Sequence, residues 1–316
     1  MVPVIEVKGL KKYFPTPRGL LHAVDDVTLT IERGKTLGVV GESGCGKSTL
    51  GRTIIHLQES TGGQIFLEGK DITHVRGKEL REARERMQII FQDPYSSLDP
   101  RQTVDATIRE PLVVSKRYKK NEIDDATAAL MEYVGIDARL RMSYPHELDG
   151  GRRQRVGIAR ALALNPEFVV CDEPVSALDV SIQAQVLNLL KKLQQDRGLT
   201  YMFVTHDMSV VRHISDDICV MYLGQVVEKC PSRELFKNPL HPYTKALLSA
   251  IPSVDIHHPN KREILKGEIT SPIDPKPGCR FAARCPFATE ACHQPQKQEE
   301  VSTGHLVRCC RVHELG

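Results

Sequence analysis

The 316-residue sequence predicts an α/β fold with a largely parallel sheet, and three observations support this prediction. First, short apolar runs with the length of buried strands occur at 36–40 (TLGVV), 167–174 (EFVVCDEP) and 200–207 (TYMFVTHD). Second, a helical pattern at 177–195 separates the last two runs. Third, a glycine-rich turn follows the first run and opens a helical segment. Apolar strands that alternate with helices are typical of a parallel sheet covered on both faces.

The remaining elements follow in chain order. Val27, Leu29 and Ile31 alternate with polar residues, which predicts a half-buried strand. We expect a helix at 47–57 and strand-like runs at 63–69 and 87–92. Residues from about Asp93 to Leu164 lack strand signals and predict an inserted helical subdomain, about 93–164. The run DICVMYLGQVVEKC predicts a closing hairpin around Gly224.

Composition limits the function classes. Lys and Arg number 43 against 40 Asp and Glu, so the net charge of +3 gives no general nucleic-acid footprint. No apolar run reaches the ~20 residues of a membrane span, and the first residues show no hydrophobic signal region. We therefore expect a cytoplasmic protein without nucleic-acid partners. Pro, His and Cys become frequent after Lys237, which divides the chain into 1–237 and an extension, 238–316.

The turn GESGCGKST matches the phosphate-loop pattern G-x-x-x-x-G-K-[ST] and lies between a strand and a helix, as that pattern requires. Glycines let backbone N–H groups face phosphates, while a lysine reaches the β- and γ-phosphates and a hydroxyl binds Mg²⁺. A chance glycine-rich turn is the alternative, and the flanking strand and helix disfavour it. We expect the nucleotide to be held by Gly41, Ser43, Gly44, Cys45, Gly46, Lys47, Ser48 and Thr49.

Two further strand ends carry polar groups. Asp172 ends a buried strand and is placed to hold Mg²⁺, and Glu173 follows it and is placed to orient the attacking water. His206 ends another such strand and is a candidate contact to the γ-phosphate. Ligands of parallel sheets collect at these carboxyl ends. The alternative is that the two carboxylates are merely solvated and that His206 is structural.

These segments, together with Gln92 in FQDPYSSLDP, DGGRRQR and SALD, resemble in order and spacing the ATPase subunit of an ABC transporter over about residues 4–230. The resemblance implies a RecA-like P-loop ATPase core with an inserted α-helical subdomain and an antiparallel β portion. It implies that Gln92 joins the Mg²⁺ surroundings and links the nucleotide to the membrane partner, and that Asp179 lies at an ATPase dimer interface. It also implies an aromatic residue stacked on adenine, for which Phe14 fits better than Tyr13.

The segment NPLHPYTKALLSAIPS at 238–253 resembles the ATPase subunits of oligopeptide and dipeptide importers, a group that includes some nickel importers. This resemblance implies a second ABC ATPase subunit in a heterodimer, two transmembrane permease subunits and an extracytoplasmic peptide-binding protein. It also implies a peripheral position on the cytoplasmic face of the plasma membrane.

Four cysteines of the extension, Cys279, Cys285, Cys292 and Cys309, resemble the cysteine motif of the same subfamily, which implies a [4Fe-4S] cluster. Their separations match neither common zinc knuckles nor common ferredoxins. Spacing alone therefore predicts an unspecified metal, and structural zinc or free thiols remain alternatives. Cys310 could replace Cys309 as a ligand, and the family position favours Cys309.

The stretch ELDGGRRQR departs from the family pattern Leu-Ser-Gly-Gly-Gln, whose serine and glycines grip the γ-phosphate bound to the opposite subunit. Asp149 replaces the serine and Arg152 the glutamine, before and after Gly150 and Gly151. An ionised carboxylate donates no hydrogen bond. Two unit charges ~4 Å apart at an effective dielectric near 20 repel by about 4 kcal/mol. We therefore expect this stretch to bind the γ-phosphate on the partner subunit only weakly, which weakens one of the two ATP sites. The alternative is that Asp149 only caps the helix.

The sequence therefore predicts an ATP-hydrolysing subunit that powers peptide import, with Glu173, His206, Lys47 and Gln92 as the catalytic set. Its expected cofactors are ATP, Mg²⁺ and a [4Fe-4S] cluster. Alternatives are the ATPase of a nickel importer, a soluble ABC ATPase acting on nucleic acid, and a mainly regulatory nucleotide-binding subunit.

Overall fold

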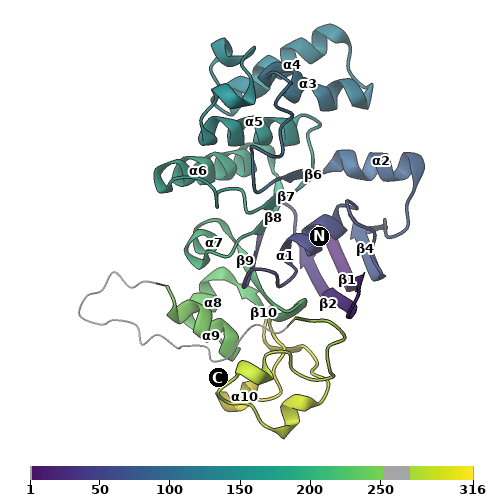
Figure 1. Ribbon diagram of the computed structural model, residues 1–316, viewed down its shortest axis with the longest axis vertical. Helices are drawn as coiled ribbons and strands as arrows, with labels where there is room; N and C mark the ends of the chain where they lie inside the picture. Colours follow the sequence, from purple (N-terminus) through teal and green to yellow (C-terminus); the bar gives the residue numbers. More distant parts are fainter. Residues whose placement is uncertain (1, 252–270, 316) are drawn as a thin grey trace, which may run out of the picture.

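The computed structural model describes residues 2–251 and 271–315. Within them, an eight-stranded sheet forms the centre of the molecule in the order β11-β12-β10-β9-β3-β8-β7-β6 (Figure 1). Its middle strands β6 to β9 and β3 run parallel, and helices lie on the connections that join β6 to β7, β7 to β8 and β8 to β9. These strands are β3 (Thr36–Val40), β6 (Met87–Ile90), β7 (Phe168–Asp172), β8 (Thr200–Val204) and β9 (Asp217–Tyr222).

The two faces of the parallel strands belong to different hydrophobic cores. Phe168 and Val170 of β7 pack with α1 (Lys47–Ile54) and a smaller antiparallel sheet. Val169 and Cys171 pack instead with α6 (Val180–Arg197) and the helical segment. All four residues are buried, so β7 reads as a continuous apolar run, which is the pattern that the sequence shows.

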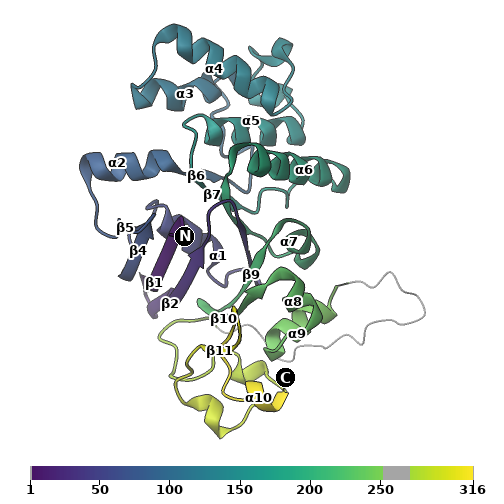
Figure 2. The same cartoon turned by 180° about the vertical axis from the view of Figure 1, so that it is seen from behind.

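The antiparallel sheet has the order β2-β1-β4-β5 and lies beside α1 (Figures 1 and 2). Val27, Leu29 and Ile31 are buried while Thr28 and Thr30 are exposed, which confirms the predicted half-buried strand. The sheet's strands are β1 (Ile5–Thr16), β2 (Gly19–Ile31), β4 (Gly62–Leu67) and β5 (Lys70–Asp71).

Residues 93–164 contain helices and no strand, as the sequence predicts, and they lie at one end of the molecule (Figure 1). The elements are α3 (Val104–Ser115), α4 (Lys120–Tyr133), η1 (Ala138–Leu140), η2 (Pro145–Glu147) and α5 (Gly150–Leu162). A further helix, α2 (Gly77–Arg86), precedes β6 and has no counterpart among the sequence predictions.

The predicted closing hairpin joins β9 to β10 (Gln225–Pro231) through Gly224, whose φ of 83° suits glycine. Helices α7 (Met208–Ile214), α8 (Ser232–Lys237) and α9 (Pro242–Ser249) surround it. The predicted boundary after Lys237 falls at the end of α8. The segment at 238–253 is described as far as residue 251, and its last two residues lie outside the described part.

The C-terminal extension continues the central sheet and touches the antiparallel sheet through one isolated bridge. Strand β12 (His305–Val307) pairs with β10, and β11 (Glu299–Ser302) pairs with β12. Earlier in the extension, Leu21 of β2 forms a bridge with Ile273. Strand β12 lies after residue 237 and pairs with β10, which lies before it, so the two predicted parts share one sheet. The division at 237 stays a prediction. The remaining elements of the extension are η3 (Ala282–Arg284), η4 (Glu290–His293) and α10 (Val312–Leu315). No helix of the described residues is long and apolar enough to cross a membrane.

Candidate functional site

The phosphate loop connects β3 to the first residue of α1, and its glycines allow close backbone contacts. A Cβ at Gly46 would lie 1.9 Å from the Ala23 carbonyl oxygen, and one at Gly41 would lie 2.2 Å from that of Met221. Both residues also have positive φ, 103° and 152°. Only glycine fits such positions without displacing a neighbouring backbone. The loop thus places backbone N–H groups at a helix N-terminus, an arrangement that suits phosphate.

Lys47, the first residue of α1, is 5% exposed, and its Nζ donates to the carbonyls of Gly41 at 2.8 Å and Glu42 at 3.0 Å. The ammonium group therefore lies inside the curve of the loop. A lysine in this position places its positive charge beside bound phosphates.

Ser48 and Asp172 meet at the base of the loop. The Ser48 hydroxyl donates to Asp172 Oδ1 at 2.6 Å, and Arg52 Nη2 donates to Oδ2 at 3.0 Å. Asp172 is fully buried at the end of β7. A hydroxyl and a carboxylate are the hard oxygen ligands that Mg²⁺ prefers. These two predicted metal residues therefore fit a magnesium site, with Arg52 balancing the remaining carboxylate charge.

Glu173, Gln92 and His206 come from three adjacent strand ends and meet at one carboxylate oxygen. Glu173 Oε2 lies 3.1 Å from Gln92 Nε2 and 3.3 Å from His206 Nδ1. Glu173 has a φ of 48°, and its N–H donates to the Val204 carbonyl of β8. Left-handed backbone at a non-glycine residue is uncommon and concentrates at functional sites.

The cavity over the loop has a volume of about 560 Å³. Phe14 of β1 lines it, whereas the Tyr13 ring stacks on His22 at 3.8 Å and its hydroxyl bonds to Asp25. Gly41 and Cys45 are not among the lining residues. The full lining is Phe14, Leu21, Ala23, Ser43, Gly44, Gly46, Lys47, Ser48, Thr49, Gln92, Glu173, His206 and Pro272.

Asp149, Gly150, Gly151 and Asp179 do not line this cavity. The Asp149 carboxylate caps α5, accepting the Arg152 N–H at 2.7 Å and lying 3.4 Å from the Arg152 guanidinium. Asp149 is over half exposed, and Asp179 is exposed at the start of α6. A Cβ at Gly151 would lie 2.7 Å from Ile182 Cγ2, so this glycine also serves the packing of α5 against α6. The stretch forms a separate exposed surface, and its predicted role toward a partner's nucleotide stays a prediction.

The four predicted cluster cysteines converge in the extension. Burial, and to a smaller extent the neighbouring thiols of Cys309, Cys292 and Cys285, raise the pKa of the Cys279 thiol to about 12. The Cys279 N–H donates to the Cys292 carbonyl at 2.7 Å. The Sγ atoms of Cys292 and Cys310 lie 3.9 Å apart.

The spacing of the thiols bears on the kind of metal. With Zn–S bonds of about 2.3 Å, four thiolates on one zinc ion lie about 3.8 Å apart. In the described residues no three cysteine sulfurs lie within 4.8 Å of one another. In a [4Fe-4S] cluster each thiolate binds a different iron, so its ligands are more widely spaced. The kind of metal that these thiols hold stays a prediction.

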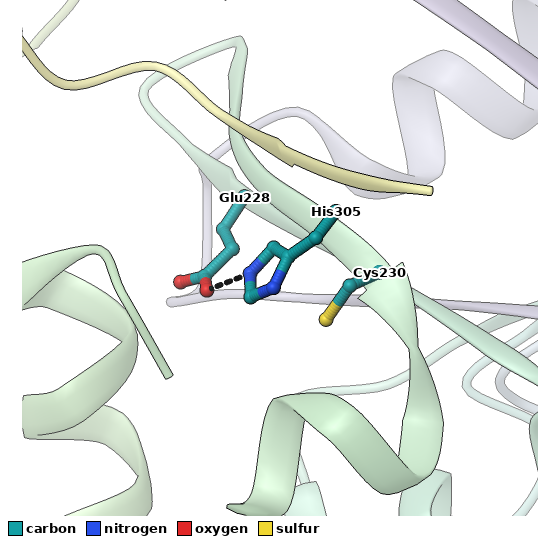
Figure 3. Close-up of side chains that lie close together, drawn as sticks. All are labelled: Glu228, Cys230 and His305. Carbon is teal, nitrogen blue, oxygen red and sulfur yellow. Dashed lines mark hydrogen bonds and ion pairs between the residues drawn. The ribbon is translucent and has the colours of Figure 1, made fainter. Parts of the chain in front are cut away.

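In the described part of the chain, one group of three possible metal ligands has its ligand atoms within 4.8 Å of one another: Glu228, Cys230 and His305 (Figure 3). His305 Nε2 lies 2.8 Å from Glu228 Oε1, and the backbone N–H groups of Leu240 and His241 donate to the same carboxylate. Burial raises the pKa of the Cys230 thiol, which keeps it protonated. With the carboxylate already occupied by donors, this group is a buried hydrogen-bonded pair of Glu228 and His305 that joins β12 to β10 and to the start of α9.

Glu228→Ala is expected to lower the free energy of unfolding by about 3–5 kcal/mol, because it leaves His305 and two buried N–H groups without their acceptor. Urea unfolding measures this loss. Removing Glu299 from its exposed pair with His313 in the same extension is the control and should change little. Equal losses from the two substitutions would contradict the prediction.

The same pair predicts a pH dependence. Burial alone would raise the pKa of the Glu228 carboxyl, but hydrogen bonds from His305 and the backbone hold it below its usual value. A carboxyl with a lower pKa in the folded state stabilises the fold above its unfolded pKa of about 4.3, and this stabilisation is lost as pH falls through the folded pKa. The wild type should therefore lose stability faster than Glu228→Gln on acidification.

Sequence reasoning missed several residues around the site. Pro272 lines the cavity from the extension, and Arg52 pairs with Asp172. Arg284 and Tyr243 contact Glu42 of the phosphate loop. The helical spacing of Arg52 behind Ser48 could have suggested its contact. The other three contacts join residues over 200 positions apart and leave no periodic signal.

Comparison with known families gives two matches. Residues 24–176 match the family described as ABC transporter, and residues 227–292 match the family described as oligopeptide/dipeptide transporter, C-terminal region.

Curated relatives match over nearly the whole chain. The oligopeptide transport ATP-binding protein AppF of Bacillus subtilis is 49% identical over 97% of this chain and 96% of its own length. The oligopeptide transport ATP-binding protein OppF of Salmonella typhimurium is 50% identical over 98% and 94%, respectively. The dipeptide transport ATP-binding protein DppF of Haemophilus influenzae is 46% identical over 98% and 97%.

Solved structures with the same fold include cbiO1 from Clostridium perfringens, part of the ABC transporter complex cbiONQ, with a TM-score of 0.67 and 28% identity over 75% of this chain and 92% of that one. An ATP-binding cassette solved as a dimer in a post-hydrolysis state, bound to ADP and Pi, has a TM-score of 0.66 and 30% identity over 72% and 99%.

Proposed function

Because the chain belongs to the family of ATP-binding subunits of ABC-type oligopeptide and dipeptide transporters, we propose that it hydrolyses ATP to power the import of peptides. The observation that carries the proposal is one cavity lined by the phosphate loop and the Glu173–Gln92–His206 group, with Asp172 hydrogen-bonded behind Ser48 of that lining.

The residues predicted from the sequence would divide the work of ATP hydrolysis among them. Phe14 offers a ring face to adenine, and Lys47 with the loop N–H groups holds the β- and γ-phosphates. Ser48, Asp172 and Gln92 would hold Mg²⁺, which neutralises charge on the phosphates. Glu173 orients the attacking water and accepts its proton. His206 donates to the transferring phosphoryl group from the neighbouring strand.

The proposed function implies partners for this chain. We propose that it pairs with a second, different ATPase subunit through the Asp149 and Asp179 surface, and with two permease subunits through the Gln92 region. A binding protein outside the membrane delivers the peptide. This chain would then lie at the cytoplasmic face of the membrane.

The test of the function is transport. In vesicles that contain the assembled permeases and both ATPases, a labelled peptide should accumulate only with Mg²⁺ and ATP. Accumulation that needs no ATP, or ATP hydrolysis that a peptide-loaded binding protein never stimulates, would contradict the proposal.

We further propose that Cys279, Cys285, Cys292 and Cys309 hold a [4Fe-4S] cluster. The convergence of their thiols and their spacing support it. The cluster would cross-link an extension with few apolar residues of its own. Its chemistry here is structural.

Protein purified without oxygen is therefore expected to be brown, with about four irons per chain. Cys309→Ser should remove most of the iron, because one of four thiolates is lost. Cys310→Ser is the matched control, since it removes the adjacent thiol, and it should keep the iron. Colourless protein with one zinc per chain would refute the cluster. Loss of iron from Cys310→Ser, with iron kept in Cys309→Ser, would instead assign Cys310 as the fourth ligand.

A further inference from the structure

The phosphate loop contains a carboxylate of its own. Glu42 follows Gly41 directly, and its backbone carbonyl accepts the Lys47 ammonium at 3.0 Å. An uncompensated negative charge at this position repels the phosphates that the loop holds. The loop therefore needs a cation to offset the Glu42 carboxylate. Lys47 does not supply it, because its ammonium group lies inside the loop, where the phosphates bind.

That cation comes from the C-terminal extension. Arg284 Nη1 donates to Glu42 Oε2 at 2.7 Å, and Nη2 donates to Oε1 at 3.1 Å. This two-bond fork is the strong arginine–carboxylate geometry. The Arg284 side chain is 8% exposed, so water screens the pair weakly. An arginine guanidinium stays charged in proteins, so Arg284 brings a permanent positive charge to Glu42.

A second contact fixes the backbone of the same residue. The Glu42 N–H donates to the hydroxyl of Tyr243 in α9 at 2.9 Å. Tyr243 is fully buried, packs edge-on against Tyr222 with ring centroids 4.7 Å apart, and lies 5.4 Å from Phe281. Phe281 directly precedes η3, which ends at Arg284. One aromatic cluster therefore supports both the Tyr243 contact and the Arg284 contact to Glu42.

From these contacts we propose that Arg284 and Tyr243 are positioning residues of the ATP site: they act through Glu42, neutralising its charge and holding the phosphate loop in its binding shape. Neither residue lines the nucleotide cavity. Two parts of the extension, α9 in green and the residues from 271 on in yellow below β10 (Figure 1), in this way contribute to nucleotide binding. The inference rests on the proposed ATPase function.

The experiment compares Arg284→Gln, Glu42→Gln and the double variant in the assembled complex, with the affinities for Mg²⁺-ATP and Mg²⁺-ADP as the readout. Arg284→Gln should weaken ATP binding about tenfold, and weaken ADP binding less, because ADP carries less charge. It should raise KM more than it lowers kcat. Glu42→Gln should bind ATP as tightly as the wild type, and the double variant should recover to within about threefold.

Arg308→Gln is the matched control. Arg308 is an equally buried arginine of the same extension, and it pairs with Asp26 of β2, outside the phosphate loop. This variant should keep ATP affinity within about twofold. A double variant as weak as Arg284→Gln, or an equal loss in Arg308→Gln, would reduce Arg284 to a general docking contact and overturn the inference.

Folding is followed by thermal unfolding of each variant. If Arg284→Gln does not fold, Tyr243→Phe decides: it removes only the hydroxyl and should weaken ATP binding about threefold, and unchanged affinity would overturn the inference. A wild type that does not bind ATP, or Lys47→Ala that binds it unchanged, would instead refute the proposed function.

Discussion

Replacing Glu173 by Gln is expected to leave ATP bound and to slow its hydrolysis at least about 100-fold, the scale of a lost general base. The amide keeps the size of the side chain and contacts to Gln92 and His206, but it cannot take a proton from water. Lys47 and Ser48 are untouched, so nucleotide affinity should stay near that of the wild type. Single-turnover hydrolysis in the assembled complex, measured beside equilibrium binding of ATP, separates the two effects.

Glu299→Gln is the control for this change, because it alters an exposed ion pair in the extension in the same chemical way. It should hydrolyse ATP at the wild-type rate. Hydrolysis by Glu173→Gln within a few-fold of that rate would remove the water-orienting role from Glu173.

The second large effect is an asymmetry between two ATP sites. Lys47→Ala in this chain should abolish most hydrolysis, while the corresponding change in the partner subunit should cost much less. The reason is that Asp149 of this chain would face the partner's γ-phosphate, where a carboxylate repels and donates no hydrogen bond. ATPase rates of complexes with one altered subunit at a time measure the difference.

Asp149→Ser tests the cause of this asymmetry, and it should strengthen ATP-driven closure at the partner's site. Arg152 lies 3.4 Å from Asp149 and offsets part of its charge, so the double variant that combines Asp149→Ser with Arg152→Gln is measured as well. Equal losses from the two lysine changes, with no response to Asp149→Ser, would leave Asp149 as the helix cap that the structure shows.

The strands, the phosphate loop and the helical segment could be predicted because their signals are local. Burial of Val27, Leu29 and Ile31 follows from alternation alone, and Lys47 and Ser48 follow from one short motif. Helix α2 was missed because its residues, GKELREARER, are mostly charged and show only a weak apolar face. Their high helix propensity was the available signal.

The contacts that join the extension to the nucleotide site could not be predicted in the same way. The contact of Arg284 with Glu42 and the place of Pro272 in the cavity wall exist only in the folded structure. Glu228 and His305 are likewise 77 positions apart, and a lone histidine in a strand gives no hint of its partner. Such pairs depend on tertiary structure, and one sequence carries no pattern for them.

The bridge between Leu21 and Ile273 has a consequence for inhibitor binding. It fixes Pro272 as a wall of the ATP cavity beside Phe14, and this wall comes from outside the ATPase core. The matches to the solved cassettes cover 92–99% of those chains but only 72–75% of this chain. At least a quarter of this chain is therefore not covered by these structures. An ATP competitor whose ring system reaches Pro272 would therefore contact a residue of the C-terminal extension as well as the ATPase core.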